Sequence, residues 1–267
     1  MPALKRNPEF LAGLVLAGLV AGMALVSLVY TPYGHNDMDP ARRFTPPGAG
    51  HLMGTDNFGR DIFSRIMIGG RYTLLVALCT VLGSAAAGSA LGLVTGYVGG
   101  LWAELVMRVI DALNSFPGLL LALVMVSIME NGPFTLIIAL FIIFIPSYVR
   151  IMRSGMLQYK DRDFIKVVEL MGASHARIIF VHILPNTAPS LLASTALGLS
   201  NAILAEATMS YLGLGIQPPI PSWGRMLSES RNFLFAAPWC ALAPGFMIMI
   251  MVISFHYIGE GITKRYS

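Results

Sequence analysis

The chain has 267 residues, of which 55% are hydrophobic and only 12% are Asp, Glu, Lys or Arg. A typical soluble domain carries about 25% charged residues. The composition therefore excludes an ordinary soluble globular protein and indicates a protein that crosses a membrane several times. The net charge of +4 comes mostly from Lys and Arg that flank apolar stretches, so it gives no reason to expect a nucleic-acid partner.

Six stretches without Asp, Glu, Lys or Arg are long enough to cross a bilayer. A spanning helix needs about 20 mostly apolar residues, whereas the strands of membrane barrels are about half as long and alternate in polarity. We therefore predict an all-α membrane protein with six transmembrane helices. The first stretch exceeds the apolar part of a typical signal peptide, so we interpret it as an uncleaved span. The stretches cover residues 10–30, 72–103, 112–129, 131–149, 178–205 and 232–259.

The distribution of positive charge predicts the orientation. If loops alternate between the two sides, Lys and Arg are more numerous on the side that holds the N-terminus. Positive residues accumulate on the cytoplasmic side of membrane proteins. We therefore expect a cytoplasmic N-terminal segment at residues 1–9, a single transmembrane domain over residues 10–267, and a cytoplasmic C-terminus.

Two segments on the predicted outer side are too long and too rich in Pro and Gly to be simple turns. Residues 31–71 begin irregularly, and from Asp61 onward their pattern predicts a short amphipathic helix that lies along the membrane before the second span. Residues 213–236 begin with a proline-rich stretch and contain Trp223, a residue type that suits a membrane interface. Residues 130–133 predict a tight outer turn.

The second apolar stretch carries small residues at a spacing of four. Such residues let two helix backbones approach closely in lipid. We expect this helix to pack tightly on another span of the same chain, rather than on a neighbouring subunit. The residues are Ser84, Gly88, Gly92 and Gly96.

Charged residues occur within or next to the predicted spans at two places. Glu104, Arg108 and Asp111 are spaced so that they can pair on one helix face, which favours a self-neutralised helix end over a proton relay. Glu206 directly follows the fifth stretch and falls inside the predicted fifth span, where an ionisable group is costly and is a functional candidate by default. The alternative is that Glu206 lies near the outer end of its helix and bonds a neighbouring loop.

Residues 160–186 form a charged insert between two apolar stretches. Charges of alternating sign recur at every third position, and apolar residues lie between them, so the segment must be covered by something outside the membrane. Gly172 suits the end of one helix, Ser174 suits the start of a second, and Pro185 predicts a break before the next span. The insert is either a rigid lever for a partner or a connector packed on its own spans.

The insert resembles the cytoplasmic EAA loop of ABC importer permeases, in which Glu-Ala-Ala is followed after three residues by Gly and then by Ile-x-Leu-Pro. Gly172 and the sequence HILPN at 182–186 match that pattern. Four other segments are similar to the second permease of dipeptide, oligopeptide and nickel importers. They are GTDNFGRDIFSR at 54–65, MRVIDALNSFPGLLLAL at 107–123, SNAILAEATMSYLGLGIQPPIPSWGRML at 200–227 and APWCALAPGF at 237–246.

One departure from the family pattern lies in the insert. The Glu-Ala-Ala positions hold Lys166, Val167 and Val168, and Glu169 stands where relatives often carry arginine. A swapped pair of Lys166 and Glu169 could keep an internal salt bridge while it reverses the charges presented to a partner.

The resemblance implies a type I ABC importer permease fold in a bacterial inner membrane, with a cytoplasmic coupling loop at about residues 153–185. The outer segments would carry docking or gating residues. Together these implied sites comprise, for ATPase coupling, Lys166, Val167, Val168, Glu169, Gly172, Ala173 and Ser174, and for outer docking or gating, Asp56, Arg60, Asp61, Glu206, Trp223 and Arg225.

The resemblance also implies the partners and the substrate. The chain would form half of a pathway, and a second homologous permease would form the other half. Its further partners would be two ATP-binding subunits, an extracytoplasmic substrate-binding protein and membrane lipid. No G-x-x-x-x-G-K-[ST] motif is present, so we expect no cofactor or catalysis in this chain and assign ATP and Mg²⁺ to the partner subunits. Di- or oligopeptides are the expected substrates, with nickel or a metal chelate as the alternative.

Two other functional classes are weaker interpretations. A membrane-embedded enzyme would need clustered catalytic side chains, but the five histidines are scattered and lack the H-E-x-x-H spacing of metalloproteases. A passive channel would be distinguished by the absence of ATP-dependent uptake.

Overall fold

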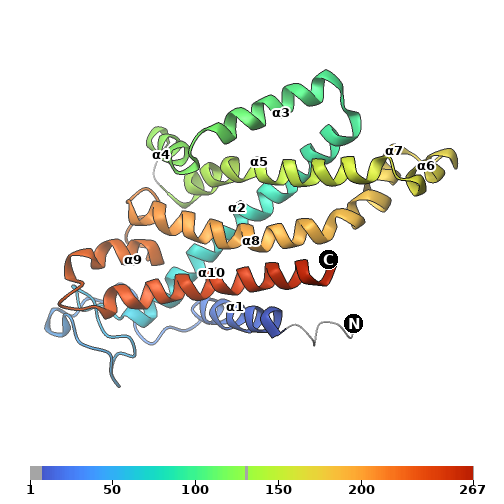
Figure 1. Ribbon diagram of the computed structural model, residues 1–267. Coiled ribbons are helices and arrows are strands. Elements are labelled where there is room, and N and C mark those ends of the chain that lie inside the picture. Colours follow the sequence, from blue (N-terminus) through green and yellow to red (C-terminus); the bar gives the residue numbers. More distant parts are fainter. Residues whose placement is uncertain (1–7, 130–131, 267) are drawn as a thin grey trace.

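The computed structural model of the protein describes residues 8–129 and 132–266, and helices form nearly all of its regular structure (Figure 1). Most of the N-terminal segment predicted at 1–9, and part of the turn predicted at 130–133, lie outside the described residues. The longer helices are α1 (Pro8–Val26), α2 (Ile62–Val98), α3 (Gly100–Ser115), α4 (Gly118–Ile128), α5 (Pro133–Lys160), α6 (Asp163–Leu170), α8 (Leu184–Tyr211), α9 (Trp223–Ser230) and α10 (Trp239–Tyr266).

Short helical segments join these elements. They are the 3₁₀ turns η2 (Pro40–Arg42) and η4 (Arg231–Phe233), the single turn α7 (His175–Arg177), and the π-helix η3 (Ile178–Ile183). Helices α7, η3 and α8 form one continuous rod of 37 residues.

In the described part of the chain, five helices are long and apolar enough to cross a membrane, and the bent pair α3–α4 makes a sixth span if its two parts are counted together. The prediction of six spans agrees with the upper count, but the predicted third span is not straight. Its two helices meet at an angle of 90°. The bend falls at Phe116 and Pro117, because proline has no N–H to continue the helix and also restricts the residue before it.

The helices lie side by side in the order α1, α10, α8 and α5, with α2 crossing diagonally behind them and α3–α4 covering α5 (Figure 1). The start of α1 and the end of α10 lie at the same end of the bundle, where Lys264 and Glu9 form an ion pair. Helix α6 lies at that end also, and α9 lies at the opposite one. We name these the α6 end and the α9 end.

The small residues of α2 make the close contact that the sequence predicts. A Cβ atom on Gly92 would lie 2.5 Å from the carbonyl oxygen of Val149, and one on Gly96 would lie 2.8 Å from Met156 Cβ. Both neighbours belong to α5. The contact is therefore within the chain, as expected.

The predicted surface helix before the second span is wrong, because α2 runs unbroken from Ile62 to Val98. Asp61 caps its first turn, where the carboxylate accepts a hydrogen bond of 2.7 Å from the Ser64 amide. Two adjacent glycines, Gly69 and Gly70, do not interrupt the helix. Their missing side chains leave room for the Trp223 ring, which would lie 2.9 Å from a Cβ atom on Gly70.

The break predicted at Pro185 is also wrong. Residues Ile178–Ile183 form a π-helical turn just before the proline, and the rod continues through it. The wider turn accommodates a residue that cannot donate its N–H, so the insert and the fifth span are helical without a break from His175 onward.

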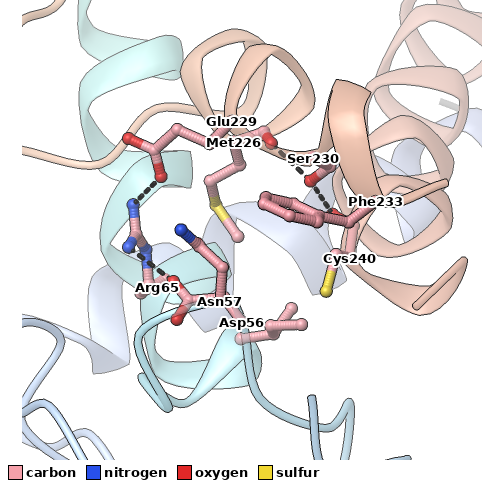
Figure 2. Close-up of a pocket in the computed structure, with 9 residues that line it drawn as sticks. Asp56, Asn57, Arg65, Met226, Glu229, Ser230, Phe233 and Cys240 are labelled. Carbon is pink, nitrogen blue, oxygen red and sulfur yellow. Dashed lines mark hydrogen bonds and ion pairs between the residues drawn. The ribbon is translucent and has the colours of Figure 1, made fainter. Parts of the chain in front are cut away.

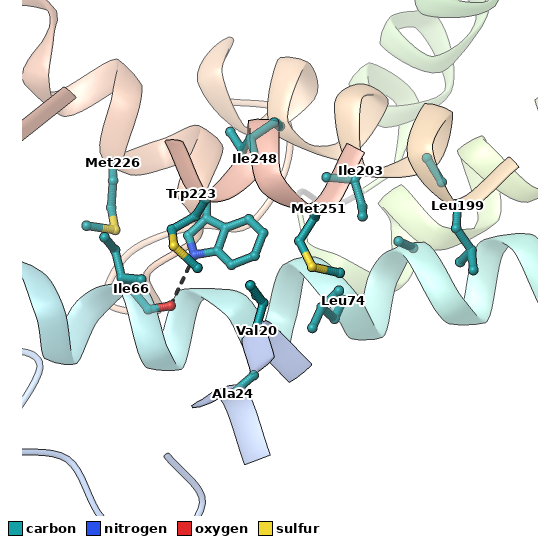
Figure 3. Packing of buried hydrophobic residues seen from close by; sticks show 14 of the residues in the cluster. Val20, Ala24, Ile66, Leu74, Leu199, Ile203, Trp223, Met226, Ile248 and Met251 are labelled. Atoms are coloured by element: carbon teal, nitrogen blue, oxygen red, sulfur yellow. Dashed lines mark hydrogen bonds between the residues drawn. The ribbon is translucent and has the colours of Figure 1, made fainter. Parts of the chain in front are cut away.

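The main core surrounds Trp223, which is fully buried (Figure 3). Its indole N–H donates a hydrogen bond of 3.1 Å to the Ile66 carbonyl. Val20 from α1, Ile203 from α8 and Met251 from α10 belong to the same cluster. Helix α9 is thereby anchored to three spans and to the start of α2.

Candidate functional site

At the α6 end, the sequence-predicted helix boundaries are confirmed. Gly172 has a φ of +80°, a conformation that favours glycine. Its amide donates to the Glu169 carbonyl at 2.9 Å, and the Ala173 amide donates to the Val168 carbonyl at 3.3 Å, which is the hydrogen-bond pattern of a Schellman C-cap. Ser174 then caps the next turn through the Arg177 amide.

Helix α6 has two apolar faces with different surroundings. Ile165 is buried and Val168 is half-buried, and both pack on Met152, Met156 and Ile178 from the neighbouring spans. The other face remains uncovered, although it is just as apolar. Its side chains and their exposed fractions are Phe164 43%, Val167 54%, Leu170 88% and Met171 81%.

The connector and lever hypotheses for the insert are thus compatible. One face of α6 packs on the chain's own spans, and the opposite face offers an apolar surface to solvent. The segments on either side of α6 also contact α2. Tyr97 of α2 and His175 share a hydrogen bond, and Lys160 donates one of 3.4 Å to the Gly96 carbonyl. A movement of α6 would therefore be transmitted to α2 as well as to α5 and α8.

Lys166 and Glu169, whose charges are exchanged relative to the family pattern, do not form a salt bridge with each other. Lys166 instead lies 3.7 Å from Asp163, one turn earlier, and both side chains are well exposed. Glu169 is also exposed. Both charges of the swapped pair are therefore free to meet groups outside this chain.

The charged residues of α3 also pair differently from the prediction. Asp111 bonds Arg150 of α5 at 2.7 Å rather than Arg108 of its own helix. The sequence spacing made an intrahelical pair possible, but α5 lies beside α3 and places Arg150 within reach of Asp111.

At the α9 end, buried charged side chains join segments that are far apart in the sequence (Figure 2). Arg65 of α2 lies 2.9 Å from Asp56 and 3.0 Å from Glu229 of α9, and its side chain is only 3% exposed. Arg60 bonds the same two carboxylates at 2.7 and 3.0 Å. Arg225 bonds Glu229 from within α9 at 3.3 Å. We call these five residues the ion cluster.

Sequence reasoning identified Asp56, Arg60 and Arg225 as candidates but missed Arg65 and Glu229. Arg65 lies within a quoted family segment, so it was visible as a charge at the start of a span. Glu229 is 164 residues away from Arg65, and no spacing in the sequence reveals their pairing.

The remaining outer candidates are also internal. Asp61 lies 2.9 Å from His51 with both side chains buried. Glu206 is fully buried, accepts a hydrogen bond of 2.7 Å from Ser210, and has the hydroxyls of Thr73 and Ser222 beside it. That hydrogen bond stays within α8, because Ser210 follows Glu206 by one turn, and Glu206 Oε2 has no hydrogen-bond partner in the described part of the chain.

The interpretation of Trp223 as a docking residue needs correction. A side chain that is fully buried in the core of its own chain presents no surface to a partner. The same burial makes Asp56, Arg60 and Asp61 structural groups of the α9 end. Of the six outer candidates, Arg225 retains the most exposed side chain, at 27%.

A family model described as "Binding-protein-dependent transport system inner membrane component" matches residues 88–267. The dipeptide transport system permease protein DppC of Alkalihalophilus pseudofirmus is 39% identical over 97% of this chain and 85% of its own length. DppC of Haemophilus influenzae is 38% identical over 97% and 90%. The glutathione transport system permease protein GsiD of Pectobacterium atrosepticum is 37% identical over 97% and 86%.

The fold is that of an ABC importer permease. A chain of the methionine ABC transporter MetNI, solved in inward-facing conformations, superposes with a TM-score of 0.64 over 76% of this chain and 96% of its own. Because the two sequences are only 17% identical, this likeness shows the fold alone.

Proposed function

Because the chain belongs to the family of binding-protein-dependent transport system inner membrane components, we propose that it is a permease subunit of an ATP-driven peptide importer. The dipeptide and glutathione permeases among its relatives favour a peptide over the nickel or metal-chelate alternative. In this role the chain contributes half of the pathway, and a second, homologous permease contributes the other half.

The observation that carries the proposal is the uncovered apolar face of α6. Leu170 and Met171 are 88% and 81% exposed on a helix that is held firmly by its opposite face. Large apolar side chains arranged in this way mark a protein interface. We assign this face to an ATP-binding subunit, which places the α6 end and both chain termini on the cytoplasmic side.

The coupling then follows from how α6 is held. ATP binding and hydrolysis occur in two partner subunits, which carry the nucleotide and Mg²⁺. Movement of those subunits would push α6, and the π-helical joint and the Tyr97–His175 contact would pass the movement into α8 and α2. A substrate-binding protein would deliver peptide at the α9 end.

A cross-linking experiment tests the assignment. Cysteines at Val167 or Met171, in a chain whose Cys79 and Cys240 are replaced by alanine, should cross-link to a co-expressed ATP-binding subunit. A cysteine at the buried position Ile165 is the matched control and should not. Cross-links from Val167 and Met171 that reach only the chain's own spans would contradict the proposal.

A further inference from the structure

The middle of helix α8 exposes a polar side chain whose hydrogen-bonding groups are unused. Within the described part of the chain, Asn201 makes no hydrogen bond, and its side chain is exposed. It lies ten residues before the end of α8 at Tyr211, which corresponds to about 15 Å along the helix. The hydrocarbon core of a bilayer is about 30 Å thick, so Asn201 lies near its midplane when Tyr211 marks the outer boundary of that core.

The neighbours of Asn201 on the same face make it distinct. Leu197 and Leu204 are apolar and exposed. Thr208 is polar, but its hydroxyl donates a hydrogen bond of 2.7 Å to the Leu204 carbonyl and is thereby satisfied within the helix. An unpaired carboxamide in hydrocarbon is costly, so the Asn201 amide must meet a partner from outside this chain.

An open groove of about 560 Å³ lies directly beside Asn201, between α8 and α10. Its lining includes Ser200, His256 and Tyr257, so it carries polar groups at a depth where lipid offers none. His256 is held by Glu260 at 3.1 Å, one turn further along α10. The volume falls within the range of about 300–1,000 Å³ that is typical of small-molecule sites.

We propose that Asn201 is a contact for the main-chain amide of the transported peptide at the midpoint of the pathway. A carboxamide offers both an N–H donor and a carbonyl acceptor, and it can therefore pair with a peptide unit through two hydrogen bonds. Such a contact is independent of the peptide's side chains. The proposal rests on the peptide-import function proposed above, and it adds the site at which the cargo is held during passage.

The first test replaces Asn201 in the reconstituted complete transporter with its binding protein. Asn201→Leu should lower peptide uptake per ATP hydrolysed by about fivefold to tenfold, because one or two neutral hydrogen bonds are lost. ATP hydrolysis stimulated by the loaded binding protein should persist. Asn201→Gln should recover part of the uptake, and the matched control Thr208→Val should behave like the unaltered chain.

The second test changes the cargo. A dipeptide whose peptide nitrogen is methylated lacks the N–H donor, so Asn201→Leu should reduce its uptake by less than half as much as that of the ordinary dipeptide. The binding protein's preference between the two peptides does not affect this comparison, because the variant and the unaltered chain receive peptide from the same binding protein. Equal losses for the two peptides overturn the proposal.

Two further outcomes also overturn it. Normal uptake per ATP in Asn201→Leu means that the amide touches no cargo. Loss of co-purification with the second permease means that Asn201 is an interface contact between subunits. The proposed import function fails separately, if the unaltered complex shows neither peptide uptake nor stimulation of ATP hydrolysis by the binding protein.

Discussion

The two ends of the bundle differ in which side chains hold their short helices in place. At the α9 end, Arg65 is 3% exposed and is satisfied by two carboxylates of its own chain. At the α6 end, Leu170 and Met171 are almost fully exposed on a short helix. An end whose charged side chains are paired within the chain is held by its own contacts, whereas we assign the exposed apolar side chains of α6 to an interface with a partner.

The contacts at the two ends also indicate different mechanical roles for the α9 end and the α6 end. The ion cluster joins the first outer segment, the start of α2 and α9, so ion pairs hold these elements to one another. The α6 end contains a glycine elbow, a single helical turn and a π-helical joint within a few residues. Deformation should therefore concentrate at the α6 end, and the α9 end should act as the fixed frame.

The largest expected effect is at the ion cluster. Arg65→Met leaves Asp56 and Glu229 without their most buried cation, and breaking a buried charge pair costs about 3–5 kcal/mol. The free energy of unfolding, measured by denaturant titration in detergent, should fall by about that amount. Arg225→Met is the matched control, and its effect should be much smaller, because that side chain is 27% exposed. Equal effects would show that the cluster is not a buried unit.

A smaller effect is expected in the frame between α2 and α5. Gly92→Ala places a methyl group 2.5 Å from the Val149 carbonyl oxygen, so the two helices must separate. Overpacking of this kind costs about 1–3 kcal/mol. Gly18→Ala on α1 is the control, because its added Cβ meets no atom within 4 Å. A thermal unfolding midpoint that falls equally for both variants would contradict the close contact.

The sequence predicted the spans and helix caps better than the contacts and bends that depend on tertiary structure. Run length predicted the spans, and small-residue spacing predicted that α2 packs closely on another span of the chain, because both depend on local composition. Gly172 and Ser174 were identified because capping is a local preference. The ion cluster depends on tertiary pairing across 164 residues. Helix α2 continues past two glycines, beside which Trp223 fills the space. The helix at Pro185 continues because a π-helical turn precedes the proline.

For the coupling site, the sequence predicted which segment to examine but not which of its side chains face outward. The sequence identified the insert and its residues, yet Val168 and Ala173 proved partly covered, whereas Phe164, Leu170 and Met171 are the exposed apolar residues. An alternating pattern of charges on a short helix does not reveal which apolar residues face the bundle. The burial of Trp223 was also missed, because aromatic residues occur both in cores and at interfaces.

The smallest effect on folding is expected from the reversed charges of α6. Lys166 and Glu169 are exposed and do not pair with each other, so the double variant Lys166→Glu with Glu169→Lys should not shift the unfolding midpoint. Its stimulated ATP hydrolysis should be no better than that of the worse single variant. Recovery in the double variant would show that the two residues act as a pair in the assembled transporter.

The exposed face of α6 provides the most direct test of the account. Leu170→Asp changes a side chain that is 88% exposed, so the free energy of unfolding of the isolated chain should change by less than about 0.5 kcal/mol. Co-purification of the ATP-binding subunits with the same variant should be lost. Retained co-purification at full stability would contradict the claim that α6 is completed by an ATP-binding subunit.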